Sequence, residues 1–154
     1  MNSSNTDRIE KRVELKAPLA RVWRALTDYK EFGVWFRVDL EAPFVPGKST
    51  RGRILYPGCE QLIMEVVVQK MEHERLFSFD WHPYAVDRKM DYSTEKPTLV
   101  KFKIEKINGG TLLIVTESGF DAIPAGRRDE AFRMNSRGWA EQMKNIEAYV
   151  SSKP

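Results

Sequence analysis

The 154-residue sequence has little of several features that define whole classes of protein. Cys59 is its only cysteine, so an internal disulfide is impossible, and its position after Pro57-Gly58 is typical of a turn. No run approaches the ~20 apolar residues that a membrane-spanning helix needs. The first seven residues are polar and lack the apolar stretch of a secretory signal, so we expect a cytoplasmic protein.

Motifs for metals and cofactors are also scarce. The two histidines, His73 and His82, stand on either side of a predicted strand, without a cysteine pair or a His-x-x-x-His spacing. There is no glycine-rich phosphate loop and no Gly-x-Ser-x-Gly elbow. The sequence therefore predicts neither a metal nor a cofactor.

Neither sign of charge dominates the chain, which has 25 basic and 22 acidic residues and a net charge of +3. The densest basic pairs, Arg51/Arg53 and Lys101/Lys103, alternate with apolar residues, which places them on the outer faces of strands. A nucleic-acid surface would need a patch of one sign interleaved with exposed aromatic residues. We therefore expect no nucleic-acid partner.

Alternating apolar residues predict seven strands. Residues 8–16 form the first, with Ile9, Val13 and Leu15 on its buried side. From residue 37 onward, turn signals at close spacing separate further alternating runs, so consecutive strands should pair as an antiparallel meander. These signals are Pro46-Gly47, Pro57-Gly58, His73-Glu74-Arg75 and Asn108-Gly109-Gly110.

Helical spacing predicts two short helices after the first strand and one long helix at the end. Pro18 suits the first turn of a helix whose apolar stripe is Leu19, Val22, Trp23 and Leu26. Asp28 and Glu31 form a possible capping box for the second short helix. Residues 126–150 form the long amphipathic helix. Gly138 within it costs about 1 kcal/mol against alanine, which close approach of the first strand or a bound ligand could explain.

A curved sheet wrapped around a long helix tends to leave a hollow, and apolar hollows are the usual small-molecule sites. The alternative for each apolar residue is that it simply fills the core. The candidate ligand-binding residues are Trp23, Trp35, Phe36, Met64, Phe77, Phe79, Trp81, Phe102, Glu117, Phe120, Trp139 and Met143.

Glu117 is the sharpest polar candidate because it shares the inward parity of Leu113 and Val115. A buried carboxylate must be hydrogen-bonded, paired or protonated. Three interpretations stay open: a structural pair with an arginine or a tyrosine hydroxyl, a ligand anchor or acid/base group, or an error of register that leaves the side chain exposed. His82 and Tyr84 begin a loop that runs to Pro97, and they could join Glu117 as proton-transfer groups at the pocket mouth.

Several blocks carry a resemblance to a known family. The run from Pro18 to Asp28, followed by Trp35-Phe36 and Pro46-Gly47, is similar to the opening of the heat-shock-protein-90 ATPase-activator homologue family, within the START-like SRPBCC superfamily. Later blocks agree in order, namely residues 75–81, residues 110–120 and Gly138-Trp139.

The resemblance implies an α+β helix-grip fold, with a seven-stranded curved antiparallel sheet around the C-terminal helix. One domain would cover residues 8–150, with flexible tails at 1–7 and 151–154. It implies binding of a lipid- or polyketide-like molecule in an internal cavity, without catalysis. The alternatives are a cyclase- or hydratase-type enzyme and a stress-related module that acts on a chaperone. Chaperone stimulation belongs to members with an additional N-terminal domain, so we expect it less.

Overall fold

The computed structural model describes residues 7–83 and 91–152. In chain order the elements are β1 (Arg8–Leu15), α1 (Leu19–Thr27), α2 (Tyr29–Phe36), β2 (Val38–Leu40), β3 (Ser49–Ile54), β4 (Ile63–Glu72), β5 (Leu76–Trp81), the 3₁₀ helix η1 (Tyr92–Thr94), β6 (Thr98–Ile107), β7 (Gly110–Ser118), the 3₁₀ helix η2 (Phe120–Ala122) and α3 (Ala125–Ser152). No helix within these ranges is both long enough and apolar enough to cross a membrane.

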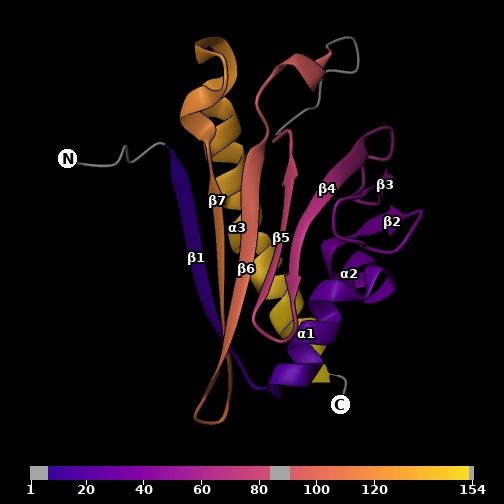
Figure 1. The fold of residues 1–154 in the computed structure, drawn as a ribbon, viewed down its shortest axis with the longest axis vertical. Coiled ribbons are helices and arrows are strands. Elements are labelled where there is room, and N and C mark those ends of the chain that lie inside the picture. The colour runs from indigo at the N-terminus through magenta and orange to yellow at the C-terminus, as the bar shows by residue number, and fades with distance from the viewer. Residues whose placement is uncertain (1–6, 84–90, 153–154) are drawn as a thin grey trace, which may run out of the picture.

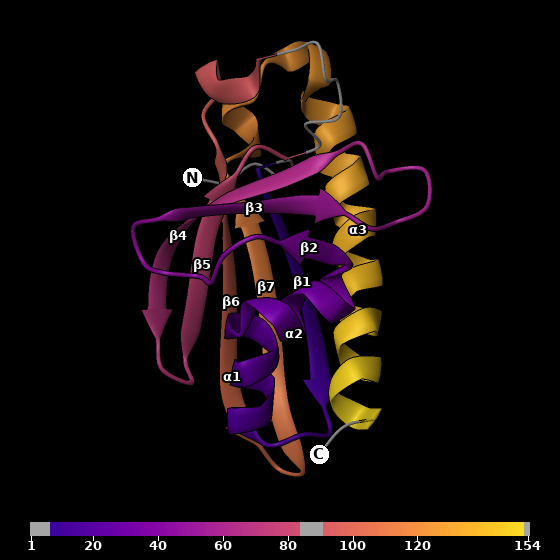
Figure 2. The same cartoon turned by 90° about the vertical axis from the view of Figure 1, so that its right-hand side faces the viewer.

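The seven strands form one antiparallel sheet in the order β1-β7-β6-β5-β4-β3-β2. Strands β2 to β7 therefore form the predicted meander, and β1 is the edge strand beside β7. Helix α3 runs along one face of the curved sheet, while α1 and α2 lie at the end of the molecule where α3 finishes (Figures 1 and 2). This arrangement confirms the predicted α+β helix-grip fold.

Strand β7 has the predicted inward parity. Leu113, Val115 and Glu117 are all buried, and Glu117 is 0% exposed. Its register places Glu117 opposite Ile9 of β1 and Val100 of β6. The interpretation that Glu117 lies exposed through a register error is therefore wrong.

The centre of the core is aromatic. Phe32 of α2 meets Phe79 and Phe102 of the sheet edge to face, with ring centroids 6.5 and 6.4 Å apart. Phe77 stacks on Phe102 across two neighbouring strands at 5.9 Å. All four rings are fully buried, so α2 is anchored to the middle of the sheet by side chains that each contribute about 1.5–3 kcal/mol on burial.

The start of α2 differs in one respect from the predicted capping box. Asp28 is the N-cap, and its carboxylate accepts from the backbone N–H groups of Lys30 at 2.9 Å and Glu31 at 3.3 Å. The Glu31 side chain does not return to the backbone N–H of Asp28, as a capping box requires. It turns instead to two arginines of α1, because a charged partner stabilises a half-buried carboxylate more than a neutral N–H does.

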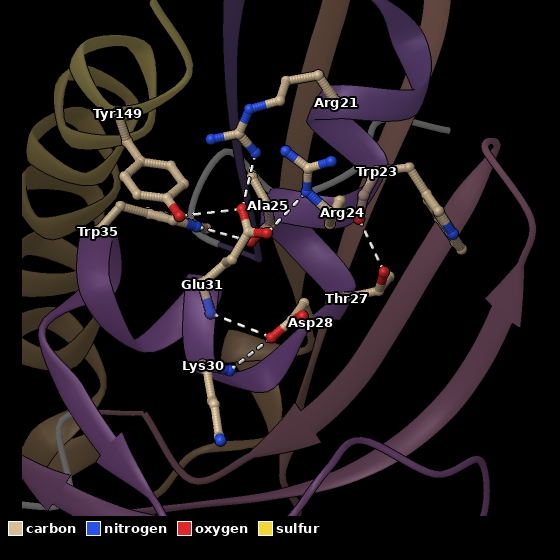
Figure 3. A network of polar contacts seen from close by, with 10 residues as sticks. All are labelled: Arg21, Trp23, Arg24, Ala25, Thr27, Asp28, Lys30, Glu31, Trp35 and Tyr149. Carbon is tan, nitrogen blue, oxygen red and sulfur yellow. Dashed lines mark hydrogen bonds and ion pairs between the residues drawn. The ribbon is translucent and has the colours of Figure 1, made fainter. Parts of the chain in front are cut away.

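Glu31 is the centre of a polar network that joins the three α-helices (Figure 3). Arg21 of α1, which is only 4% exposed, donates to one Glu31 oxygen at 2.7 Å, and Arg24 donates to the other at 2.7 Å. The Tyr149 hydroxyl of α3 also donates to Glu31, at 2.9 Å, and its ring centroid lies 4.9 Å from the Arg21 guanidinium carbon. This network holds the end of α3 against the α1–α2 pair.

The network shifts the pKa values of two of its members. Burial by itself raises the pKa of Glu31, but the hydrogen bonds from Tyr149 and Arg21 and the Arg21 charge outweigh it, so the pKa lies below its ordinary value. Burial and the bond to Glu31 raise the pKa of Tyr149. The lowered pKa means that ionised Glu31 stabilises the fold above its unfolded-state pKa, and that this contribution is lost as the pH falls through the folded-state pKa.

We expect Glu31→Gln to lower the free energy of unfolding by about 2 kcal/mol at pH 7, because it removes the charged carboxylate to which buried Arg21 donates. The deficit relative to wild type should shrink below about pH 4, as the wild-type carboxylate becomes protonated. Urea unfolding at several pH values measures both effects. Glu41→Gln is the matched control, since Glu41 and Arg51 form an exposed ion pair at 3.7 Å that should contribute under about 0.5 kcal/mol. A deficit that does not change with pH would contradict the assignment of the effect to the Glu31 charge.

Candidate functional site

Two adjoining hollows lie between the sheet, the end of α2 and one face of α3. The first is about 290 Å³ in volume and is lined by Phe36, Tyr56, Trp81, Asn135, Gly138, Trp139, Glu141 and Gln142. The second is about 220 Å³ and is lined by Phe36, Ile54, Leu62, Ile63, Met64, Glu65, Trp81, His82, Pro83 and Asn135. They share Phe36, Trp81 and Asn135, and together we call them the α3 cleft.

One face of α3 forms the helical wall of the cleft. Asn135, Gly138, Trp139 and Gln142 follow one another at spacings that place them on the same side of a helix. A side chain at Gly138 would meet no atom within 4 Å of its Cβ. The prediction that the first strand approaches Gly138 closely is therefore wrong, and the space beside it opens on the cleft.

Four donors converge on Glu117 behind the cleft. Its Oε1 accepts from the indole N–H of Trp139 at 2.8 Å and from the Asn135 amide at 3.0 Å. Its Oε2 accepts from the indole N–H of Trp81 at 2.7 Å and from the Thr98 hydroxyl at 2.5 Å. The donors come from β5, β6 and α3, so one carboxylate joins three elements that are far apart in the sequence.

All four partners of Glu117 are neutral. The prediction of a structural arginine or tyrosine partner is therefore wrong, and none of the ion pairs between described residues includes Glu117. An indole N–H can only donate, so both tryptophans suit an acceptor such as a carboxylate. Because Trp81 and Trp139 also line the cleft, Glu117 fixes the orientation of two of its walls.

The structure places the predicted binding residues in two groups. Phe36, Met64, Trp81 and Trp139 line the α3 cleft, with Glu117 directly behind two of them. Trp23 is half-buried beside His73, with ring centroids 5.9 Å apart, and lines neither hollow. The remaining predicted residues are buried and also line neither hollow, namely Trp35, Phe77, Phe79, Phe102, Phe120 and Met143.

His82 lines the rim of the second hollow, and it is not among the hydrogen-bond partners of Glu117. Its Nε2 lies 2.9 Å from the backbone oxygen of Glu95. Arg127, at the start of α3, forms an ion pair with Glu95 at 2.6 Å and donates to the backbone oxygen of Pro83 at 2.9 Å. This rim is therefore tied to α3. Tyr84, the other predicted proton-transfer residue, lies outside the described residues.

Sequence reasoning missed five polar residues that line the cleft, namely Tyr56, Glu65, Asn135, Glu141 and Gln142. Asn135 lies four residues before Trp139, and Gln142 lies three residues after it. Both polar residues interrupt the apolar stripe of the helix, and this interruption could have indicated that they line a site. Tyr56 precedes a turn without periodicity, and only the fold brings its hydroxyl to Asn145 of α3, which donates to it at 3.0 Å. Over the described ranges, no three His, Cys, Asp or Glu side chains gather in a way that could hold a metal ion.

A comparison with protein families matches residues 16–151 to the family described as "Activator of Hsp90 ATPase homolog 1-like protein". The match covers most of the chain and begins at the connection between β1 and α1. A comparison with curated proteins found no match.

Solved structures share the fold at low sequence identity. A protein from Arthrobacter aurescens has a TM-score of 0.79 and 15% identity, with 99% of this chain and 91% of that chain covered. Ms6760 from Mycobacterium smegmatis has a TM-score of 0.77 and 14% identity, with 100% and 96% covered. DynU16, described as a protein of the dynemicin biosynthetic locus, has a TM-score of 0.72 and 22% identity over 94% of this chain. This chain spans about half the length of DynU16, with 47% of that chain covered.

We expect Glu117→Gln to lower the free energy of unfolding by about 1–3 kcal/mol, because each carboxylate oxygen accepts from one indole. In either orientation of the new amide, its NH₂ group would face an indole N–H. Urea unfolding measures the loss, and tryptophan fluorescence reports the freed indoles. Glu105→Gln, on the exposed side of β6, is the matched control and should stay within about 0.5 kcal/mol of wild type. A Glu117→Gln variant as stable as this control would show that the four donors do not depend on the carboxylate.

Proposed function

The chain belongs to the family of activator of Hsp90 ATPase homolog 1-like proteins, and from this premise we propose that it binds a hydrophobic or amphipathic small molecule in the α3 cleft. The observation that carries the proposal is the cleft itself. Its two hollows, of about 290 and 220 Å³, approach the size of known small-molecule sites, which is roughly 300–1,000 Å³.

The lining of the cleft supports a ligand that has both apolar and polar parts. Phe36, Trp81 and Trp139 supply aromatic surface, and their centroids lie 5.8–6.1 Å apart. Asn135 and Gln142 supply amide groups on the same wall. A fold shared with a protein of a biosynthetic locus is in keeping with a small-molecule ligand.

Binding fits the geometry of Glu117 better than catalysis does. Oε1 of Glu117 already accepts two hydrogen bonds and Oε2 accepts three, so a proton-transfer role would require breaking contacts that orient the cleft walls. The described hydrogen bond of the His82 ring is with the backbone oxygen of Glu95 and does not involve Glu117. A chaperone-directed module would instead need an exposed docking face, and the family name alone supports that alternative.

Gly138→Leu tests the proposal, because the side chain would extend into the first hollow without meeting protein atoms at its Cβ. We expect stability to rise by up to about 1 kcal/mol, since leucine is the better helix former. Affinity for the neutral fluorescent probe N-phenyl-1-naphthylamine should fall at least about tenfold, or about 1.4 kcal/mol of binding free energy. Probe titration and urea unfolding give the two numbers.

Gly126→Leu is the matched control. Gly126 also lies in α3 with no atom within 4 Å of a Cβ, but it lines neither hollow, so probe affinity should not change. Equal affinity of wild type and Gly138→Leu would place the probe outside the cleft and contradict the proposal. Mass spectrometry of compounds that co-purify with wild type, but not with Gly138→Leu, would identify the natural ligand.

A further inference from the structure

Tyr56 stands at one end of the α3 cleft. It lines the first hollow and not the second, and its hydroxyl oxygen lies 3.0 Å from the amide nitrogen of Asn145. Asn145 follows Asn135 by ten residues, or about 15 Å along the helix axis. Since Asn135 lines both hollows, the Tyr56 hydroxyl lies at the end of the first hollow that is farther from the second.

The direction of the hydrogen bonds around Tyr56 is fixed from the backbone oxygen of Phe36, which can only accept. The Gln142 group that faces this oxygen at 3.1 Å must therefore be the NH₂ of the amide, so the Gln142 side-chain oxygen faces Asn145 at 3.0 Å. That oxygen can also only accept, so the Asn145 group must be its NH₂. The same Asn145 nitrogen meets the Tyr56 hydroxyl, whose oxygen is consequently the acceptor in this bond.

The hydroxyl hydrogen of Tyr56 is left to donate elsewhere. A phenol oxygen that accepts one hydrogen bond still carries its own O–H donor. Among the described residues, Asn145 is the hydrogen-bond partner of this hydroxyl, and none accepts its hydrogen. Because Tyr56 lines the first hollow, a molecule bound there can accept it.

The other donor side chains that line the first hollow already donate to protein oxygens. They are Trp81, Asn135, Trp139 and Gln142, and their acceptors are Glu117 and the Phe36 backbone. Tyr56 differs from them because its hydroxyl accepts within the protein and its hydrogen is not used there. A ligand can engage this hydrogen without breaking a contact of the fold.

Three contacts hold Tyr56 in place. Its backbone oxygen accepts from the N–H of Cys59 at 2.9 Å, which closes a turn. The Arg37 guanidinium carbon lies 5.2 Å from the centroid of its ring, and Asn145 holds its hydroxyl. A donor that is already held loses little conformational freedom when a ligand binds, so more of its hydrogen-bond energy contributes to affinity.

From these observations we infer that the α3 cleft selects ligands with an oxygen acceptor, such as a carbonyl, at one end of a hydrophobic body, and that Tyr56 donates to this acceptor. The inference rests on the proposed function and narrows its ligand class. The hydrophobic body would lie in the first hollow beside Gly138, against Phe36 and Trp139. The hydrogen bond from Tyr56 would replace the hydration that the acceptor loses on entering the cleft.

Two naphthalene probes of the same shape test the inference on the full chain. In 2-acetylnaphthalene the side group carries a ketone oxygen, and in 2-isopropenylnaphthalene a CH₂ group replaces that oxygen. We expect Tyr56→Phe to lower the ketone-to-alkene affinity ratio about fivefold or more, because the bound ketone oxygen loses its donor. Titrations followed by tryptophan fluorescence give the affinities.

Infrared difference spectroscopy of the bound ketone provides a second measurement. A hydrogen bond to a carbonyl oxygen weakens the C=O bond, so the carbonyl stretch should lie at a lower frequency in wild type than in Tyr56→Phe. A purely structural role of Tyr56 would not change this frequency. The same frequency in both proteins would contradict the inference.

Tyr29→Phe is the matched control. Tyr29 is also a half-buried tyrosine, but it lines neither hollow of the cleft, so the affinity ratio should stay within about twofold of wild type. The ratio compares two probes of one shape on the same variant. A general loss of packing would therefore weaken both probes and leave the ratio unchanged.

The outcomes distinguish the two proposals. A ratio that Tyr56→Phe leaves unchanged, with both probes still weakened by Gly138→Leu, would overturn the acceptor-bearing ligand and leave small-molecule binding in place. Probe affinities that do not respond to Gly138→Leu would overturn both. An equal fall of the ratio in Tyr56→Phe and Tyr29→Phe would also overturn the inference, because the effect would not come from the hydroxyl in the cleft.

Discussion

Burying Glu117 removes a carboxylate from water, and the protein must supply hydrogen-bond donors to offset the lost hydration. It does so with side chains from three separate elements: Trp81 at the end of β5, Thr98 at the start of β6, and Asn135 with Trp139 on α3. Each donor holds its element at a set distance from β7. The position of α3 over the sheet, and the orientation of two cleft walls, therefore follow from one buried acceptor.

Side-chain contacts hold helix α3 at three positions along its length. Near its start Arg127 pairs with Glu95, in the middle two side chains bind Glu117, and near its end Tyr149 joins the network of Arg21 and Glu31. Hydrogen bonds and ion pairs of this kind restrain both the distance and the direction between their partners, whereas the hydrophobic effect is not directional. The α3 cleft lies beside the middle attachment, so its shape is held by fixed side chains on either side.

The cleft face of α3 is less favourable for helix formation than the rest of its buried stripe. Gly138 and Asn135 are weaker helix formers than alanine or leucine, and nothing in the described protein contacts the space beside Gly138. Proteins commonly retain such local costs where a site needs open space or a polar group. A larger side chain at position 138 would favour the helix but would reduce the volume of the cleft. A substitution there can therefore separate the stability of the protein from its function.

The sequence by itself determined the seven strands, the meander, the three main helices and the inward side of β7, because these depend on apolar periods that are local to each segment. Helix periodicity also placed Trp139 on the buried face of α3. Only the tertiary structure decided which groups bind Glu117, since Trp81, Thr98 and Asn135 are separated by whole elements and no local pattern specifies the distance between them. The same reason explains why the Glu31 side chain binds Arg21 and not the backbone N–H that the predicted capping box requires. Arg21 belongs to another helix, and an ion pair in a half-buried site is stronger than a neutral local hydrogen bond.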